Sequence, residues 1–326
     1  MRKILFYGAS VTAQTGLTGY FDFVRDALNT LNLETFRVAY GGCHIDDAGF
    51  YRLESALTND LNYIVFEWNT TGLNIYNELK LSHILKILKA RSIKPIFVII
   101  PQEVTMKGNR NSENQIYSLC NRFNIPLLDL RVGLSVYDFN EMVRDVVHTN
   151  EIGAQFYSNK IIAFLKLVLA EENNYWHEFN AHESDALDLI NPKAFAMDLT
   201  LKVGEVLQIK IKSFSNVYSE IIIRHRIGPF SPIALISDGA VSRKLSLWDP
   251  YCHYEREHFS ILINNIDLKY SYLRSPLYYN ISIDSDLPKY DLCRRDNVNF
   301  DVEKLIKINE FYSSGVDFDL DVVKGV

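Results

Sequence analysis

The first half of the chain alternates short apolar runs with segments of helical periodicity, and this alternation constrains the fold more than any other feature. The apolar, β-rich runs lie at residues 4–7, 36–40, 63–68, 95–100 and 126–130. Apolar residues at helical spacing lie between and after them, at 21–31, 79–88 and 152–169. Strands that alternate with helices pair in parallel through right-handed crossovers, and strands without a polar face are buried on both sides. The pattern predicts a doubly wound, flavodoxin-like α/β domain with a five-stranded parallel sheet.

The second half of the chain has a different texture. Alternating or β-branched runs at 196–203, 206–211, 219–225, 234–236, 259–263 and 278–283 are separated by turn signals such as Val203-Gly204-Glu205 and Asp238-Gly239. This favours a mainly-β, sandwich-like domain, with one short helix near 302–311. A chain of 326 residues is long for one core. We expect a first domain at 1–174, a linker at 175–193 and a β-rich accessory domain at 194–326.

Charge and cysteine usage exclude several classes of function. The formal net charge is −6, so there is no basic field to hold nucleic acid or an anionic membrane. No segment reads as a signal peptide or reaches the roughly 18 apolar residues of a membrane span, which favours a cytoplasmic location. The four cysteines (Cys43, Cys120, Cys252 and Cys293) form no CxxC pair, a pattern typical of reduced thiols.

A doubly wound sheet binds its ligand at the carboxyl ends of its strands, so site residues are expected directly after each strand. Small and polar residues occur at these places. They are Gly8-Ala9-Ser10 after the first strand, Gly41-Gly42-Cys43-His44 after the second, Asn69-Thr70 after the third, Pro101-Gln102-Glu103 after the fourth and Asp145-Val146-Val147-His148 beyond the fifth.

These residues include the parts of a nucleophilic site. A serine needs a base to take its proton during attack, and histidine fills that role near neutral pH when a carboxylate holds its tautomer. The oxyanion that develops needs hydrogen-bond donors. Ser10, His148 with Asp145, a backbone N–H near Gly42 and the Asn69 amide could supply these functions.

The strings "YGAS", "YGG", "EWN" and "DVVHTNEIG", in this order, resemble the blocks of the SGNH (GDSL-like) hydrolase superfamily. The resemblance covers roughly the first 170 residues. It implies that Ser10 is the nucleophile, that its N–H, Gly42 and Asn69 are oxyanion donors, and that His148 is the base with Asp145 as its partner. Gly153 matches a glycine that often follows the family's catalytic histidine.

The sequence also departs from the family pattern. The usual Gly-Asp-Ser is Gly8-Ala9-Ser10, and the usual Gly-x-Asn-Asp is Glu67-Trp68-Asn69-Thr70. In the second block, Gly41 and Gly42 are alternatives for the donor. Each residue has a plainer interpretation as well: Ser10 as a turn or N-cap residue, Gly41-Gly42 as a tight turn, Asn69 as an Asx-turn residue, Asp145 as a partner of Arg144, and His148 as a helix-entry residue.

Other chemistry-bearing residues give weaker signals. His44 is better explained as a turn residue than as a substrate contact, and Cys43 as a small filler than as a nucleophile. Cys252, His253 and His258 fit no standard zinc spacing, and there is no Gly-rich phosphate loop, so neither a metal nor a cofactor is expected. Core packing accounts for most tyrosines of the second domain better than sugar stacking does; they are Tyr251, Tyr254, Tyr270, Tyr272, Tyr278 and Tyr279.

The sequence therefore predicts a serine esterase that hydrolyses a small acyl ester, with an acetyl ester of a carbohydrate as the first hypothesis for the substrate. An O-acetyltransferase that passes the acyl group to a saccharide would use the same triad and stays open as an alternative. A non-catalytic carbohydrate-binding protein that retains the fold is the alternative from another class.

Overall fold

The structure is a computed structural model that describes residues 2–71, 75–171, 176, 190, 192–215, 218–228, 231–247, 255–264, 267–268, 277–284 and 305–324. The chain divides into two compact units, Met1–Ser184 and Asp185–Val326. Most of the predicted linker, residues 175, 177–189 and 191, lies outside the described residues, as do Cys252, His253, Cys293, Tyr251, Tyr254, Tyr270 and Tyr272. None of the helices that the structure describes combines the length and apolar character needed to cross a membrane.

The first unit contains the five-stranded parallel sheet that the sequence predicts. Its strands are β1 (Arg2–Gly8), β2 (Leu33–Ala39), β3 (Tyr63–Glu67), β4 (Lys94–Ile99) and β5 (Leu127–Asp129), in the order β2-β1-β3-β4-β5. Gly8, the last residue of β1, pairs with Ala39 in β2 and with Glu67 in β3. These three strands therefore end at one level, and the segments that follow them leave the sheet along the same edge.

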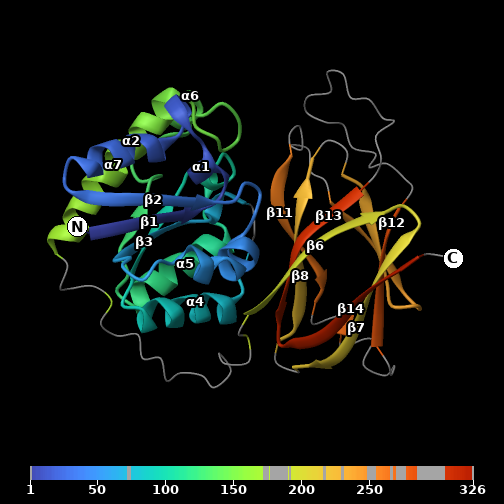
Figure 1. Cartoon of the computed structure of the whole chain (residues 1–326). Helices are drawn as coiled ribbons and strands as arrows, with labels where there is room; N and C mark the ends of the chain where they lie inside the picture. The colour runs from blue at the N-terminus through green and yellow to red at the C-terminus, as the bar shows by residue number, and fades with distance from the viewer. Residues whose placement is uncertain are drawn as a thin grey trace. The chain divides into compact units, whose positions relative to one another are not determined.

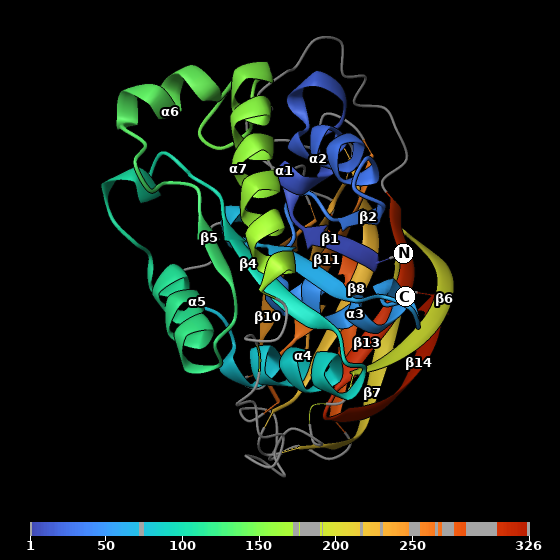
Figure 2. The same cartoon turned by 90° about the vertical axis from the view of Figure 1, so that its left-hand side faces the viewer.

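Helices cover both faces of this sheet, as Figure 1 and the turned view in Figure 2 show. One face carries α2 (Tyr20–Asn29) and α7 (Glu151–Ala170), whose Val24, Leu28, Ile161 and Leu165 pack on Ile4, Phe6, Val65 and Val98. The other face carries α4 (Glu78–Ala90) and α5 (Asn111–Arg122). Shorter helical segments are α1 (Ser10–Ala13), η1 (Gly16–Thr18), η2 (Ile45–Gly49), α3 (Leu53–Ala56), η3 (Asn69–Thr71), η4 (Thr105–Lys107) and α6 (Val136–Met142).

The second unit is a β-sandwich of two antiparallel sheets. One sheet has the order β10-β9-β12-β7-β14 and the other β11-β8-β13-β6. The strands are β6 (Pro192–Lys202), β7 (Glu205–Phe214), β8 (Glu220–Ile227), β9 (Ile233–Ser237), β10 (Ser242–Ser246), β11 (Arg256–Ile263), β12 (Leu277–Ile283), β13 (Leu305–Ser314) and β14 (Val316–Lys324).

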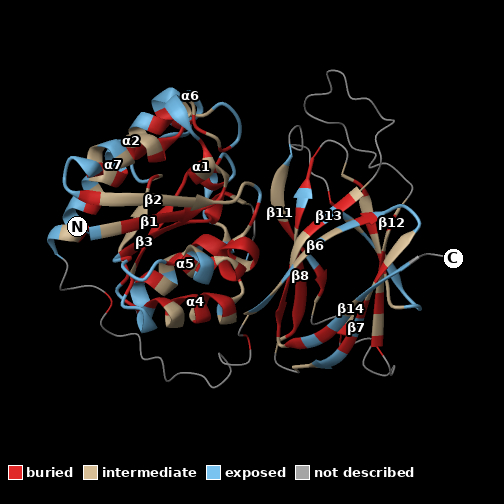
Figure 3. Ribbon diagram, viewed as in Figure 1, coloured by how far each residue is buried: buried red, intermediate tan, exposed pale blue. Residues whose placement is uncertain are grey.

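One apolar core joins the two sheets of the sandwich. Leu207, Ile209, Ile281 and Phe318 from one sheet pack with Ile221, Ile223, Ile308 and Phe311 from the other. Figure 3 shows the same pattern as buried residues along the strands of both units. The prediction of a sandwich-like second domain is confirmed by this arrangement.

One element of the second unit was predicted wrongly. The segment 302–311 was expected to be a short helix, but residues 305–314 form β13, which pairs with β6 on one side and β8 on the other. Ile306 and Ile308 are buried while Lys307 is exposed, and such alternation is the period of a strand. Two partner strands satisfy the backbone here and override the local helical spacing.

Candidate active site

The turn after β1 holds Ser10 at the edge of the sheet. A Cβ atom on Gly8 would lie 2.5 Å from Thr12 Oγ1 and 2.6 Å from the carbonyl oxygen of Glu67, so only glycine allows β1, β3 and α1 to approach this closely. The backbone N–H of Ala9 donates to the Glu67 carbonyl at 2.8 Å. Ser10 follows as the first residue of α1, and its side chain is half-buried.

The turn after β2 lies beside Ser10. The Tyr40 N–H donates to the Gly8 carbonyl at 3.0 Å, and a Cβ atom on Gly41 would lie 3.9 Å from Ser10 Cβ. Gly42 is exposed and has φ +75°, a conformation that favours glycine. Within the described part of the chain, the backbone N–H groups of Ser10, Gly41 and Gly42 donate no backbone hydrogen bond. This edge therefore offers backbone donors to a ligand.

Asp145 and His148 form a hydrogen-bonded pair in the segment that leads from α6 to α7. His148 Nδ1 lies 2.9 Å from Asp145 Oδ2 and 3.1 Å from Oδ1. Asp145 Oδ1 also accepts the backbone N–H groups of Val147 at 3.0 Å and of His148 at 2.8 Å. Partial burial acts to raise the pKa of Asp145, but these hydrogen bonds and the His148 ring together hold it below its usual value. The carboxylate therefore stays ionised and fixes the orientation of the ring.

The residue after His148 fastens this segment to the Ser10 region. Gln14, which follows α1, donates through Nε2 to the Thr149 carbonyl at 3.1 Å and accepts the Thr149 N–H at 3.3 Å. These bonds join positions 135 residues apart. Ser10 and His148 are not hydrogen-bonded to each other among the contacts of the described residues, and catalytic hydrogen bonds commonly tighten only when substrate binds.

Gly153 allows α7 to start close to the end of α6. A Cβ atom at this position would lie 2.0 Å from the carbonyl oxygen of Met142. The Asn150 side chain caps the helix by accepting the Gly153 N–H at 3.0 Å. Glycine at this position, five residues beyond His148, therefore allows the close approach of the two segments.

The Asn69 side chain is buried and points into the protein at the end of β4. Its Oδ1 accepts the Ile100 N–H at 3.0 Å, and its Nδ2 donates to the Ile100 carbonyl at 2.8 Å and to Glu113 Oε1 at 3.3 Å. Gln102 Nε2 donates to the Asn69 carbonyl at 2.5 Å. Both amide hydrogens of Asn69 are thus used within the protein, the longer bond being the one to Glu113.

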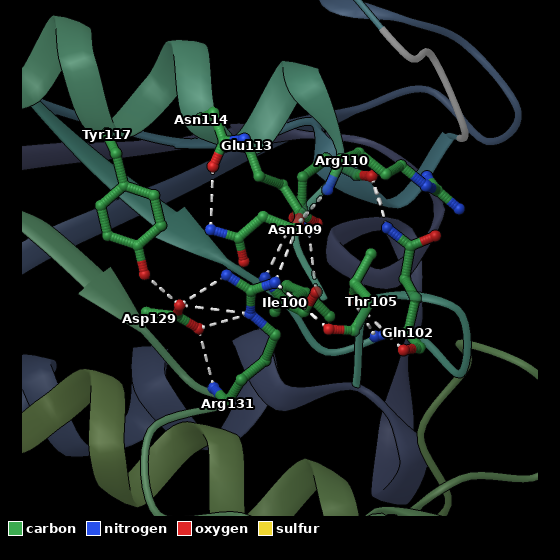
Figure 4. A network of polar contacts seen from close by, with 11 residues as sticks. Ile100, Gln102, Thr105, Asn109, Arg110, Glu113, Asn114, Tyr117, Asp129 and Arg131 are labelled. Carbon is green, nitrogen blue, oxygen red and sulfur yellow. Dashed lines mark hydrogen bonds and ion pairs between the residues drawn. The ribbon is translucent and has the colours of Figure 1, made fainter. Parts of the chain in front are cut away.

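Glu113 connects Asn69 to a buried ionic network, which Figure 4 shows. Arg131 Nη1 lies 2.8 Å from Glu113 Oε2, and Arg131 Nη2 lies 2.6 Å from Asp129 Oδ2. The Tyr117 hydroxyl also donates to Asp129. All three charged side chains are at most 9% exposed. Buried charges are costly unless they are paired and hydrogen-bonded, so these ion pairs keep Glu113 in place. Glu113 in turn accepts a hydrogen bond from the Asn69 amide and favours its observed orientation.

Glu67 is a polar residue of this edge that the sequence reasoning did not single out. The signal was present, because Glu67 is the one charged residue in the otherwise apolar strand Tyr63–Glu67. Its side chain is buried and accepts hydrogen bonds from Thr12 and Thr70. Burial raises the pKa of Glu67 to about 7 against the opposing effect of these bonds.

The remaining candidate residues from the sequence are buried or contact other side chains. His44 Nδ1 lies 2.7 Å from Thr71 Oγ1, and burial lowers the pKa of His44 to about 4. Cys43 is fully buried, as expected for a filler. His258 faces His225 across β11 and β8. Over the residues described, no group of three or more His, Cys, Asp or Glu side chains could hold a metal ion.

Comparisons with known proteins identify the fold. Neither a family model nor a curated protein sequence matches this chain. Among solved structures, the chain is similar to a two-domain esterase (CEX) active on acetylated mannans, with a TM-score of 0.67 at 12% identity over 96% of this chain and 91% of that one. The same esterase co-crystallised with mannopentaose gives a TM-score of 0.66 at 12% identity over 96% and 90% of the two chains. The fold predicted from the sequence, a doubly wound α/β domain followed by a β-rich domain, is confirmed.

Proposed function

We propose that the protein is a serine esterase that hydrolyses a small acyl ester, with Ser10 as nucleophile, His148 as general base and acid, and Asp145 as the partner of His148. The observation that carries this proposal is the hydrogen-bonded pair Asp145–His148. The next residue, Thr149, is hydrogen-bonded to Gln14, which directly follows the short helix that begins at Ser10. A fold shared with an esterase adds support.

In the proposed reaction, Ser10 Oγ attacks the acyl carbonyl carbon and His148 Nε2 takes the hydroxyl proton. The tetrahedral intermediate collapses with cleavage of the ester C–O bond, and His148 returns the proton to the departing alcohol. Water then attacks the acyl-Ser10 ester, gives a proton to His148, and releases the carboxylic acid as Ser10 recovers its proton. Asp145 stabilises the imidazolium in both steps and is not itself protonated.

The oxyanion of each tetrahedral intermediate needs hydrogen-bond donors. In this proposal the main donors are backbone N–H groups. The N–H groups of Ser10 and Gly42 lie at the edge where the first three strands end, and Gly41 is the alternative because it lies beside Ser10. Asn69 joins as a donor when its amide exchanges the 3.3 Å bond to Glu113 for one to the oxyanion.

The proposed substrate is an acetyl ester of a carbohydrate. The structurally similar esterase is described as active on acetylated mannans, and we carry that substrate class to this chain as a proposal. The β-rich unit, expected at residues 194–326 after a linker at 175–193, is proposed to be an accessory domain; its first strand, β6, already begins at Pro192. A cytoplasmic location stays a prediction from the sequence.

Assays with acetylated oligosaccharides test this proposal. The wild-type protein is expected to release acetate, while Ser10→Ala and His148→Ala are expected to release none. Incubation with acetyl-CoA and an unacetylated oligosaccharide separates the alternative, because acetyl transfer that exceeds acetate release would identify an O-acetyltransferase. A folded wild-type protein that neither hydrolyses nor transfers acetyl groups would favour the non-catalytic carbohydrate-binding alternative.

A further inference from the structure

The short helix that presents Ser10 has no capping side chain of its own. In α1 the N-cap residue is Ala9, and no side-chain cap hydrogen bond is present. Helices usually begin with Ser, Thr, Asp or Asn, whose oxygen accepts the N–H of the second or third helical residue. An alanine offers no such acceptor. With only four residues, α1 has few internal hydrogen bonds with which to hold its own first turn.

Glu67 supplies the missing acceptor from a different strand. Its Oε2 accepts the backbone N–H of Thr12, the third residue of α1, at 3.2 Å. The same oxygen accepts the Thr12 hydroxyl at 2.8 Å. The Tyr20 hydroxyl, from α2, lies 2.7 Å from Thr12 Oγ1 and completes the chain of hydroxyl groups.

The second oxygen of Glu67 holds the neighbouring turn. Glu67 Oε1 accepts the Thr70 hydroxyl at 2.8 Å, and Thr70 belongs to η3, the turn that begins with Asn69. The Glu67 carbonyl also accepts the Ala9 N–H. One residue therefore binds the segment of the proposed nucleophile and the segment of a proposed oxyanion donor.

The network around Glu67 is closed to solvent. Glu67 is 1% exposed, Thr12 is 0% exposed and Thr70 is 8% exposed. In such surroundings hydrogen bonds are strong and an unpaired partner is costly. Burial, together with the nearby Glu67 carboxyl group, raises the pKa values of Tyr20 from α2, Tyr157 from α7 and Tyr76.

We infer that Glu67 is a positioning residue, which takes the place of an N-cap for the Ser10 helix and locks that helix to the Asn69 turn. The inference rests on the proposed function of Ser10. Glu67 does not touch the reacting atoms; it acts through Thr12 and Thr70. Removal of its acceptors would let α1 shift relative to the donors of the oxyanion, and small displacements of reacting groups slow chemistry strongly.

The test is the second-order rate constant for labelling by a fluorophosphonate probe, measured on folded full-length variants. Glu67→Ala removes all three bonds, and labelling is expected to slow by roughly tenfold or more because the nucleophile is no longer fixed. In Glu67→Gln the amide oxygen can keep both Thr12 bonds and its NH₂ group can donate to Thr70, so labelling is expected within about threefold of wild type.

A matched pair at Thr12 tests the same link if Glu67→Ala fails to fold. Thr12→Val loses the hydroxyl at nearly constant shape, and its labelling by the probe is expected to be slow. Thr12→Ser keeps the hydroxyl, and its labelling is expected to stay close to the wild-type rate. With acetyl esters as substrate, Thr12→Val is expected to lower kcat with little change in KM. Wild-type rates in folded Glu67→Ala or Thr12→Val would overturn this inference alone. An unlabelled wild-type protein would instead overturn the proposed function, and this inference with it.

Discussion

The Asp145 carboxylate holds His148 at two points, accepting its backbone N–H at 2.8 Å and its ring Nδ1 at 2.9 Å. The double attachment sets both the backbone of the segment and the plane of the ring. Since Asp145 lies on the Nδ1 side, the ring presents Nε2 as its other polar atom, which is the atom that would take the Ser10 proton in the proposed reaction.

Replacement of Asp145 by asparagine is expected to separate orientation from charge. The Asn oxygen can still accept the N–H groups of Val147 and His148, but its NH₂ group faces Nδ1 and favours the wrong ring tautomer. If Asp145 has the proposed role, kcat for an acetyl ester is expected to fall roughly ten-thousandfold, as the corresponding substitution does in established Ser-His-Asp triads. Steady-state kinetics measure this, with the exposed helix-capping Asp138→Asn as control. Activity of Asp145→Asn equal to that of Asp138→Asn would contradict the role.

Asn69 is expected to matter for stability as well as for activity. Asn69→Ala would leave the Ile100 N–H and carbonyl and one oxygen of Glu113 without their partners in a buried place. Unsatisfied buried polar groups make this substitution cost about 3 kcal/mol of unfolding free energy. Urea denaturation measures the loss, and the exposed Asn59→Ala is expected to show almost none. Equal stability of the two variants would mean that the Asn69 bonds contribute little.

Much of the fold could be predicted because buried parallel strands leave a clear pattern. The five apolar runs of the first unit correspond to β1 to β5, and the strand-end rule placed Ser10 and Gly41 at one edge. The β-strands β10 and β14 were missed. In β14, Asp317, Asp319 and Asp321 alternate with apolar residues. Aspartate is depleted in strands, so local propensity argued against a strand here, and pairing with β7 overrides that propensity.

The site was harder to predict where its contacts are tertiary. No local sequence pattern shows that the Asn69 amide donates hydrogen bonds to Ile100 and Glu113, because these partners lie 31 and 44 residues away. The same holds for Glu67 and Thr12, which are 55 residues apart. By contrast, Asp145 and His148 are only three residues apart, so the spacing itself carried the information.

Gly153→Ala is expected to destabilise the start of α7. The added methyl group would lie 2.0 Å from the Met142 carbonyl oxygen, so the helix or the end of α6 must shift. Overpacking of this kind costs about 2 kcal/mol or more. Thermal melting measures the change, with the exposed Asn159→Ala in the same helix as control. A melting temperature for Gly153→Ala equal to that of the control would show that the two helices can separate freely.

The buried Glu67 is expected to make stability depend on pH. Its pKa is raised from 4.5 to about 7 in the folded protein, so its stabilising contribution is present below pH 4.5 and is lost as pH rises through 7. Relative to Glu67→Gln, the wild type should lose about 3 kcal/mol of unfolding free energy between pH 4.5 and pH 8. Asp47, whose pKa burial also raises to about 7, is common to both proteins and cancels. A difference in unfolding free energy between the two proteins that stays constant across this pH range would contradict the raised pKa of Glu67.

Covalent labelling is the most direct test of Ser10 as the nucleophile. Full-length protein is incubated with a fluorophosphonate, and intact mass with peptide mapping locates the adduct. We expect one adduct per chain on Ser10, full labelling of the exposed-serine control Ser55→Ala, none in Ser10→Ala and strongly slowed labelling in His148→Ala. A folded wild-type protein that stays unlabelled, or labelling that persists in Ser10→Ala, would contradict it.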